Sequence, residues 1–226
     1  MQHLETTNDT PLILFSGMGS DARLFRLQAP HFSRMIVPDW LPPVPRETLP
    51  EYGQRMARQL NLNEPCFVGG ASFGGLVALE VARHLPTRGC FLISSIRSRP
   101  ELPWRYRWLT PFATLVPGLC VTLSQLFARA ALGVTDRITK RNPLSPFRVI
   151  AEDEGDFHRW AGVATLRWSP PKEGWNFPIF QIHGDRDSVF DTHRSQAETI
   201  IPGGGHLLPL THPQIITRFI QNGMQK

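Results

Sequence analysis

The stretch from Cys66 to Leu85 constrains the fold of this chain more than any other. A short apolar run, Cys66–Val68, leads into the glycine-rich run GGASFGG at 69–75, and apolar residues then continue almost to Pro86. The first run predicts a buried strand, and the second predicts a helix that stops at Pro86. A serine with one glycine two residues before it and another two residues after it, at a strand-to-helix turn, is the G-x-S-x-G nucleophile-elbow pattern.

The glycines that flank Ser72 have a steric function. A Cβ at either flank would clash in so tight a turn, and the turn forces Ser72 into a backbone conformation that most residues avoid. The hydroxyl then stands clear of the sheet, and the Phe73 N–H lies at the helix N-terminus, where it has no intrahelical acceptor. The pattern favours an exposed nucleophile, although a packing turn without chemistry would also explain the pentapeptide alone.

The other apolar segments alternate between strand and helix patterns. Strands are predicted at 11–15, 35–37, 66–70, 89–94, 179–182 and 199–201, and further helices at about 21–31, 48–60, 157–168 and 213–222. Thr48 is the expected N-cap of the second of these helices, with Glu51 three residues on as its capping-box partner. This alternation, with continuous apolar strands, predicts an α/β fold: a mostly parallel central sheet with helices on both faces.

The alternation breaks between the fourth and fifth predicted strands. Residues 97–175 contain helical patterns and no convincing strand, so the sequence predicts a core of residues 1–96 and 176–226 with a helical cap, 97–175, inserted after the fourth strand. The apolar segment 112–132 is interrupted by Pro117 and Arg129. It therefore predicts a helical hairpin with an exposed or pocket-facing apolar side, capable of transient membrane contact, and no transmembrane span.

Charge and cysteine content limit the possible partners. The net charge of +5 is concentrated between residues 97 and 172, where twelve Lys and Arg residues face six acidic ones. This bias fits a solvated face, a membrane surface, an anionic substrate or nucleic acid, but no nucleic-acid motif accompanies it, so no nucleic acid is expected. The cysteines, Cys66, Cys90 and Cys120, have no metal-ligand spacing, and we expect no metal or organic cofactor. Residues 1–10 are polar and are no signal peptide, and a cytoplasmic location is expected.

Two more motifs follow predicted strands. The strand at 179–182 ends in HGDRD at 183–187, and the strand at 199–201 ends in PGGGH at 202–206. The carboxyl ends of parallel strands lie at one edge of a sheet, which is where ligands bind in open α/β folds. A serine hydroxyl becomes a nucleophile when a base takes its proton and a third group orients that base. The chain order serine, carboxylate, histidine supplies all three groups.

These motifs together resemble the α/β-hydrolase superfamily, in the form of a serine hydrolase with a helical cap insertion. The similarity covers the chain apart from its middle segment and a missing N-terminal strand pair. It implies that Ser72 is the nucleophile, His206 the base, and Asp187, the last residue of G-x-x-D, the orienting acid. Asp185, two residues nearer the strand, is a competing acid. Only nineteen residues separate Asp187 from His206, so the helix usual between them should shrink to a turn or two around 191–196.

The same resemblance implies an oxyanion hole made by the backbone N–H groups of Phe73 and Met18. Many relatives carry His-Gly before the latter position, where this chain has Ser16-Gly17, but the donated group is backbone. A βα loop without chemistry is the alternative for 16–20. The remaining histidines have simpler interpretations. His183 is expected to be a hydrogen-bonded structural histidine, and His193 and His212 are expected at the surface.

The resemblance predicts hydrolysis of a carboxylic ester of a small, largely apolar substrate through an acyl-enzyme. The alternatives are a thioesterase or acyltransferase acting on a phosphopantetheine- or CoA-type thioester, and a non-catalytic ligand-binding member of the fold. Dehalogenation is disfavoured, because that branch has an aspartate at the position of Ser72.

The aromatic residues of the predicted cap either line an apolar acyl pocket or form the cap's own core, and basic residues at the start of the cap are candidates to hold an anionic group. The candidates are Trp104, Trp108, Phe112 and Trp160 for the pocket, and Arg97, Arg99, Arg105 and Arg107 for the anion.

Overall fold

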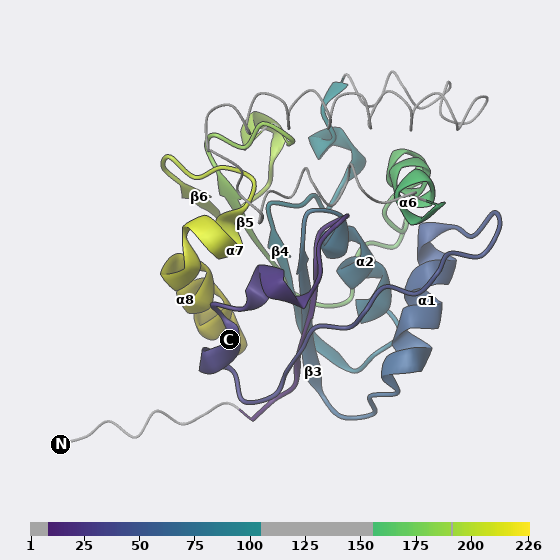
Figure 1. The fold of residues 1–226 in the computed structure, drawn as a ribbon, viewed down its shortest axis with the longest axis horizontal. Helices are drawn as coiled ribbons and strands as arrows, with labels where there is room; N and C mark the ends of the chain where they lie inside the picture. The colour runs from purple at the N-terminus through teal and green to yellow at the C-terminus, as the bar shows by residue number, and fades with distance from the viewer. Residues whose placement is uncertain (1–8, 105–155, 191) are drawn as a thin grey trace.

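A six-stranded parallel sheet organises the chain in a computed structural model, which describes residues 9–104, 156–190 and 192–226 (Figure 1). Every neighbouring pair of strands is parallel, in the order β2-β1-β3-β4-β5-β6. The predicted α/β class and all six predicted strands are confirmed, with bounds that differ by two residues at most. The strands are β1 (Leu12–Phe15), β2 (Met35–Ile36), β3 (Cys66–Ala71), β4 (Thr87–Ile93), β5 (Ile179–Gly184) and β6 (Thr199–Ile201).

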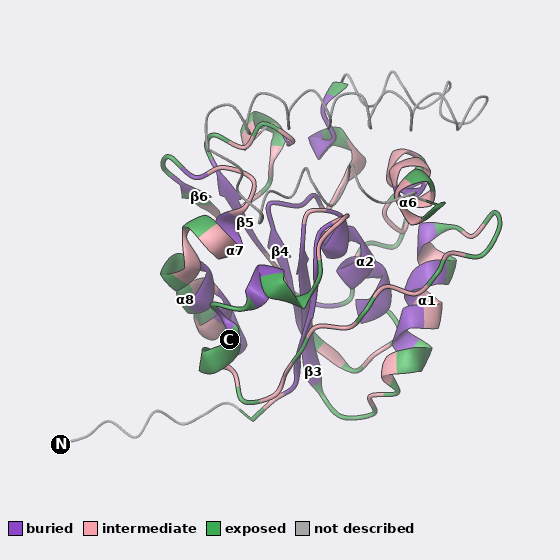
Figure 2. Ribbon diagram, viewed as in Figure 1, coloured by how far each residue is buried: buried purple, intermediate pink, exposed green. Residues whose placement is uncertain are grey.

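Helices cover both faces of this sheet, whose strands are mostly buried (Figure 2). Alternate residues of the strands supply a separate apolar cluster to each face. Helices α1 (Leu49–Leu60) and α2 (Phe73–Ala82) pack on one face, while α7 (Leu208–Thr211) and α8 (Pro213–Met224) lie on the other. In β1, Ile13 points to the first cluster and Leu12 to the second. The period-two pattern of the strands thus builds two cores around one sheet.

Helix α1 begins as its sequence predicts. The Thr48 hydroxyl accepts from the Glu51 N–H at 3.4 Å, and the Glu51 carboxylate accepts from the Thr48 N–H at 2.8 Å. Helix α2 is buried on every side, which suits its nearly continuous apolar sequence. It ends at Ala82, earlier than the predicted stop at Pro86, and the Thr87 hydroxyl donates to the Ala82 carbonyl at 2.9 Å.

The helix predicted over residues 21–31 is wrong. Two short 3-10 helices, η1 (Ala22–Phe25) and η2 (Ala29–His31), occupy this segment. Pro30 explains the break, because proline lacks an N–H and disfavours helical geometry in the residue before it. Between the two turns, the buried Gln28 side-chain amide donates to the Pro209 carbonyl at 3.0 Å and ties the segment to α7.

The described part of the predicted cap consists of its two ends. The short 3-10 helix η3 (Arg99–Glu101) follows β4, and α6 (Asp156–Arg167) confirms the helix predicted over 157–168. The buried face of α6 joins the apolar cluster of α1 and α2, and the Trp168 indole N–H donates to the buried Glu80 carboxylate of α2 at 2.7 Å. The hairpin predicted over 112–132 lies outside the described residues, and the division between core and cap stays a prediction.

Two further predictions concern cysteines and membrane spans. Cys66 and Cys90 are buried in the core, as predicted. Burial raises the pKa of the Cys66 thiol to about 11 and also raises that of Cys90, so neither is a thiolate at neutral pH. None of the helices within the described residues has the length and apolar character needed to cross a membrane.

Candidate active site

Three loops at the carboxyl ends of the strands bring the predicted site residues together. Ser72 stands between β3 and α2, Asp187 follows β5, and His206 follows β6. His206 Nε2 lies 2.9 Å from the Ser72 hydroxyl, and His206 Nδ1 lies 2.8 Å and 3.0 Å from the two Asp187 oxygens. Because an ionised carboxylate only accepts, Nδ1–H donates to Asp187 and leaves Nε2 to accept from the Ser72 hydroxyl.

The competing acid does not reach this histidine. Asp185 is exposed, and its carboxylate accepts from the Gly203 N–H at 2.7 Å, which links the loop after β5 to the loop after β6. Of the two carboxylates, Asp187 is therefore the one in contact with His206.

Ser72 has the strained backbone that its flanking glycines predict. Its φ of 54° and ψ of −124° are unusual for a residue with a side chain. A Cβ on Gly70 would lie closer than 3.0 Å to the Gly74 backbone, and a Cβ on Gly74 would lie as close to the Ser16 carbonyl. The Ser72 N–H donates to the Ile93 carbonyl of β4 at 3.0 Å and holds the turn against the sheet.

Asp187 is an inaccessible carboxylate with several donors. Its side chain has no exposed surface, and one of its oxygens accepts from the N–H groups of Val189 at 2.8 Å and Phe190 at 3.1 Å. Burial by itself would raise the pKa of Asp187, but the side chains of His183 and His206 and the Phe190 N–H lower it well below its ordinary value. Asp187 is thus held as an anion.

The loop that carries His206 fits closely against the end of β5. Gly203 has a positive φ of 73°, and the Gly204 carbonyl accepts from the Arg186 N–H at 2.9 Å. A Cβ on Gly184 would lie closer than 3.0 Å to the backbone of Gly204. The glycines therefore allow the acid and base loops to touch backbone to backbone. Between these loops, the predicted short turn is the 3-10 helix η4 (Thr192–Arg194).

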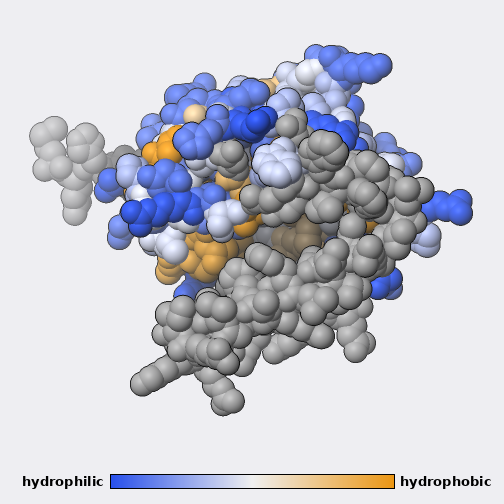
Figure 3. Space-filling model, turned by 90° about the horizontal axis from the view of Figure 1, so that it is seen from above, coloured by the Kyte–Doolittle hydropathy of each residue, from blue (hydrophilic) through white to orange (hydrophobic). Residues whose placement is uncertain are grey.

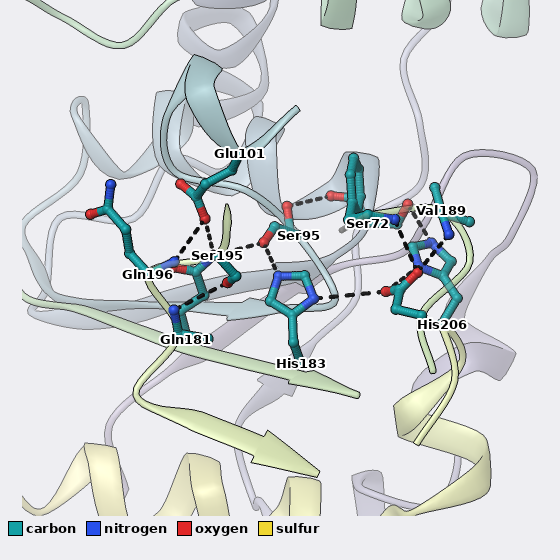
Figure 4. A network of polar contacts seen from close by, with 12 residues as sticks. Ser72, Ser95, Glu101, Gln181, His183, Val189, Ser195, Gln196 and His206 are labelled. Atoms are coloured by element: carbon teal, nitrogen blue, oxygen red, sulfur yellow. Dashed lines mark hydrogen bonds and ion pairs between the residues drawn. The ribbon is translucent and has the colours of Figure 1, made fainter. Parts of the chain in front are cut away.

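His183 is buried and hydrogen bonded, as expected of a structural histidine, and its Nε2 lies 2.7 Å from the Ser95 carbonyl. Its other ring nitrogen, Nδ1, faces the Asp187 carboxylate at 3.7 Å (Figure 4). Ser95, which the sequence did not single out, also donates its hydroxyl to the Ser72 carbonyl at 2.6 Å. In the sequence, only the polar pair Ser94-Ser95 directly after an apolar strand indicated that Ser95 could hydrogen bond to neighbouring elements. The other two histidines differ in exposure: His193 is exposed and His212 is half-buried.

One predicted oxyanion-hole residue, Phe73, follows Ser72 directly, and the other, Met18, belongs to a turn that approaches Ser72 through Gly17. Phe73 is the first residue of α2, so its N–H has no acceptor within the helix. Met18 belongs to the turn after β1, and a Cβ on its neighbour Gly17 would lie 3.6 Å from Ser72 Cβ. The Ser16 hydroxyl donates to the Ser20 carbonyl at 2.8 Å and the Ser20 hydroxyl to the Gly17 carbonyl at 2.9 Å, which fixes this turn.

Of the four candidate pocket residues, the structure describes Trp104 and Trp160. The ring of Trp160 packs at 4.4 Å from that of Tyr52 and edge-on to that of Phe73, and its indole N–H donates to the Glu47 carbonyl at 2.7 Å, so Trp160 belongs to an aromatic cluster. Trp104 is 63% exposed. Trp108, Phe112, Arg105 and Arg107 lie outside the described residues.

An acyl pocket at Ser72 and an anion site at the cap stay predictions. A cavity of about 530 Å³ lies between the segment 43–50 and α6, but Ser72 and His206 do not line it. The guanidinium of Arg97 contacts the Gln196 carbonyl and lies 3.5 Å from the Glu198 carboxylate, so protein groups already partner it. The described surface seen from above is mostly hydrophilic around a smaller apolar area (Figure 3). Among the described residues, no group of three or more His, Cys, Asp or Glu side chains is placed to hold a metal ion.

The lowered pKa of Asp187 predicts a pH-dependent contribution to stability. Because the folded-state pKa lies below the ordinary value of about 3.9, ionised Asp187 stabilises the fold fully above that pH, and this contribution is lost as the pH falls toward the folded-state value. We expect Asp187→Asn to lower the free energy of unfolding by roughly 2 kcal/mol at neutral pH. Urea unfolding of both proteins across the acid range should show this difference shrinking below about pH 4. If the difference in unfolding free energy between the two proteins stays constant down to acid pH, Asp187 is not the ionised, stabilising carboxylate inferred here.

Comparisons with known proteins identify the family and the fold. A family model described as the alpha/beta hydrolase family matches residues 12–218. An esterase from Thermogutta terrifontis, solved with malate bound, is 21% identical with a TM-score of 0.67, covering 96% of this chain and 89% of its own. A hydrolase from Pseudomonas aeruginosa PA01 is 16% identical with a TM-score of 0.69, covering 97% and 91%. A bromoperoxidase from Bacillus anthracis is 17% identical with a TM-score of 0.65, covering 96% and 92%. Comparison with curated proteins gave no significant match.

Proposed function

Because the chain belongs to the alpha/beta hydrolase family, we propose that it is a serine hydrolase that cleaves a carboxylic ester of a small, largely apolar substrate. The observation that carries this proposal is the hydrogen-bonded chain from Ser72 through His206 to Asp187. Family membership alone would not select this chemistry, since the structural neighbours include a bromoperoxidase as well as esterases. The serine with a base in hydrogen-bonding distance favours attack on a carbonyl carbon.

In the proposed reaction, the Ser72 hydroxyl attacks the ester carbonyl while its proton passes to His206 Nε2. Asp187, ionised and buried, stabilises the imidazolium and keeps its Nδ1–H directed at the carboxylate. The imidazolium then gives its proton to the leaving alcohol, and an acyl group stays on Ser72. Water, deprotonated by His206, attacks this acyl-enzyme; the bond from the acyl group to Ser72 then breaks, the imidazolium returns the proton to the Ser72 oxygen, and the carboxylic acid leaves.

The oxyanion formed in both steps would be met by the N–H groups of Phe73 and Met18. Phe73 supports this role because its N–H has no acceptor within α2, and Met18 because its turn abuts Ser72. Losing one donor of this kind typically costs about 3 kcal/mol of barrier stabilisation. Both donors are backbone groups, so no side-chain substitution removes them directly.

A hydrolysis series tests the proposal. p-Nitrophenyl esters of increasing acyl length are assayed beside acyl-CoA thioesters of the same lengths, with wild type and Ser72→Ala. We expect wild type to hydrolyse the oxygen esters, and a fluorophosphonate probe to label Ser72 in wild type and not in the variant. Faster turnover of the acyl-CoA series would select the thioesterase alternative, which the basic charge of residues 97–172 favours. A folded wild type that the probe does not label would select a non-catalytic ligand-binding protein.

A further inference from the structure

The proposed reaction uses one side of the Asp187 carboxylate, and a second histidine occupies the other. Asp187 Oδ2 lies 2.8 Å from His206 Nδ1 and 3.7 Å from His183 Nδ1. The Phe190 ring packs against both imidazoles, with ring centroids 6.5 Å from His183 and 5.7 Å from His206. His183 and Asp187 have no exposed side-chain surface, so water does not screen their contact.

The hydrogen bond at the far side of the His183 ring fixes where one of its protons lies. The partner of Nε2 is the Ser95 carbonyl oxygen, at 2.7 Å, and a carbonyl can only accept. Nε2 therefore carries a proton. Nδ1 is buried without a hydrogen-bond partner and faces the carboxylate. A neutral ring would direct a bare lone pair at a buried anion, whereas a doubly protonated ring directs an N–H at it.

The other charged groups around this contact are few. Across the carboxylate lies His206, and on the Ser95 side lies Glu101, a buried carboxylate that reaches Ser95 only through Gln181 (Figure 4). The Gln181 amide donates to Glu101 at 2.7 Å and to the Ser95 carbonyl at 2.9 Å. Glu101 also accepts from the Arg97 N–H at 3.1 Å and the Ser98 hydroxyl at 2.7 Å. In the described residues, Asp187 is therefore the anion in direct contact with His183.

Ser95 connects this histidine to the nucleophile. Its hydroxyl donates to the Ser72 carbonyl, and its own carbonyl accepts from His183. Ser94, the residue before it, has a positive φ of 45°, which is a strained value for a serine. This kink at the end of β4 allows Ser95 to face the elbow with its side chain and β5 with its carbonyl. The backbone of the nucleophile is thus connected to the buried acid through two residues, Ser95 and His183.

We infer that His183 is a positioning residue of the site: an imidazolium that donates through Nε2 to Ser95 and, through Nδ1, holds Asp187 in place for His206. This inference rests on the proposed function and adds a fourth side chain to it. His183 touches neither substrate nor reacting atoms. It keeps Oδ2 in line with His206 and supplies a buried positive charge beside the acid throughout the reaction.

Two variants separate the two contacts of His183, the hydrogen bond from Nε2 to Ser95 and the ion-pair contact of Nδ1 with Asp187. His183→Gln places an amide N–H near the position of Nε2 and keeps the contact with Ser95, while His183→Asn places one near Nδ1 and keeps the contact with Asp187. Loss of the Nε2 donor leaves the Ser95 carbonyl with its bond from Gln181. We expect kcat for ester hydrolysis to fall roughly 10- to 100-fold in His183→Gln and clearly less in His183→Asn, with KM unchanged in both. If kcat falls no further in His183→Gln than in His183→Asn, the inference is overturned. That result would mean that His183 acts by holding Ser95 at the end of β4, because His183→Gln keeps this contact and His183→Asn loses it.

A spectroscopic measurement tests the inference without activity and without a variant that must be active. Wild type labelled with 15N in its histidine rings is examined by NMR at about neutral pH, and the His183 signals are identified by their absence in the variants. We expect both His183 ring nitrogens in the protonated range. A bare Nδ1 overturns the inference, even if the fluorophosphonate probe labels Ser72 and the proposed function stands. A wild type that neither hydrolyses esters nor takes up the probe refutes the proposed function, while the NMR result still decides whether the ion pair with Asp187 exists.

Discussion

Ser72→Ala is expected to lower kcat for ester hydrolysis by about four to six orders of magnitude while leaving the fold intact. The hydroxyl that would form the acyl-enzyme is removed, and His206 loses the group whose proton it takes. Alanine keeps the Cβ, so the strained backbone at this position is unchanged and the free energy of unfolding should move little. Stopped ester hydrolysis assays with active-site titration measure the first effect, and thermal unfolding measures the second.

The control for this prediction compares the double variant with the two single variants. His206→Ala should lose nearly as much activity as Ser72→Ala, and the double variant should be no worse than either, because the two residues act as one unit. If the fold-loss of activity in the double variant equals the product of the two single fold-losses, Ser72 and His206 contribute separately. A Ser72→Ala protein with more than a hundredth of wild-type activity would contradict the proposed nucleophile.

Gly184→Ala is expected to lower kcat/KM by about 100-fold and the free energy of unfolding by about 2–3 kcal/mol. The added Cβ would meet the backbone of Gly204 closer than 3.0 Å, and backbone cannot rotate out of the way. The loop that carries His206 must then shift, which moves the imidazole away from Ser72 and Asp187. Ester hydrolysis and urea unfolding measured on the same protein check the two effects.

Gly205→Ala is the matched control, since Gly205 stands next to His206 in the same loop but a Cβ there would have no heavy atom within 4 Å. Its backbone does not have the positive φ that would strain an alanine. Activity within a few-fold of wild type and unchanged stability are expected. If both variants lose activity equally, the loop needs glycine for flexibility, and the close backbone contact with Gly184 is not what positions His206.

The sequence was sufficient to place Ser72, Asp187 and His206 at one edge of the sheet because each follows a recognisable apolar strand. Motif position and strand order together bring such residues close in space. Which carboxylate contacts the histidine could not be decided this way, because Asp185 and Asp187 differ by two residues in one loop. The distinction depends on the direction of each side chain, which places Asp187 inward and Asp185 toward Gly203.

Long-range contacts account for what the sequence did not predict. The partner of His183 is a carbonyl 88 residues earlier in the chain, and only the pairing of β4 with β5 brings the two together. The helical pattern at 21–31 was overridden by one proline. The contact of Trp160 with Tyr52 is likewise set by the packing of α6 against the core, and its role as a pocket residue stays a prediction.

Glu101 and Trp168, on either side of residues 105–155, are both fastened to the core by buried hydrogen bonds, to Gln181 of β5 and to Glu80 of α2. We therefore expect the sequence between these two anchors to tolerate change without loss of the fold around the sheet. Segments exchanged with relatives should therefore have their junctions between Glu101 and Trp168, so that both anchoring hydrogen bonds are kept.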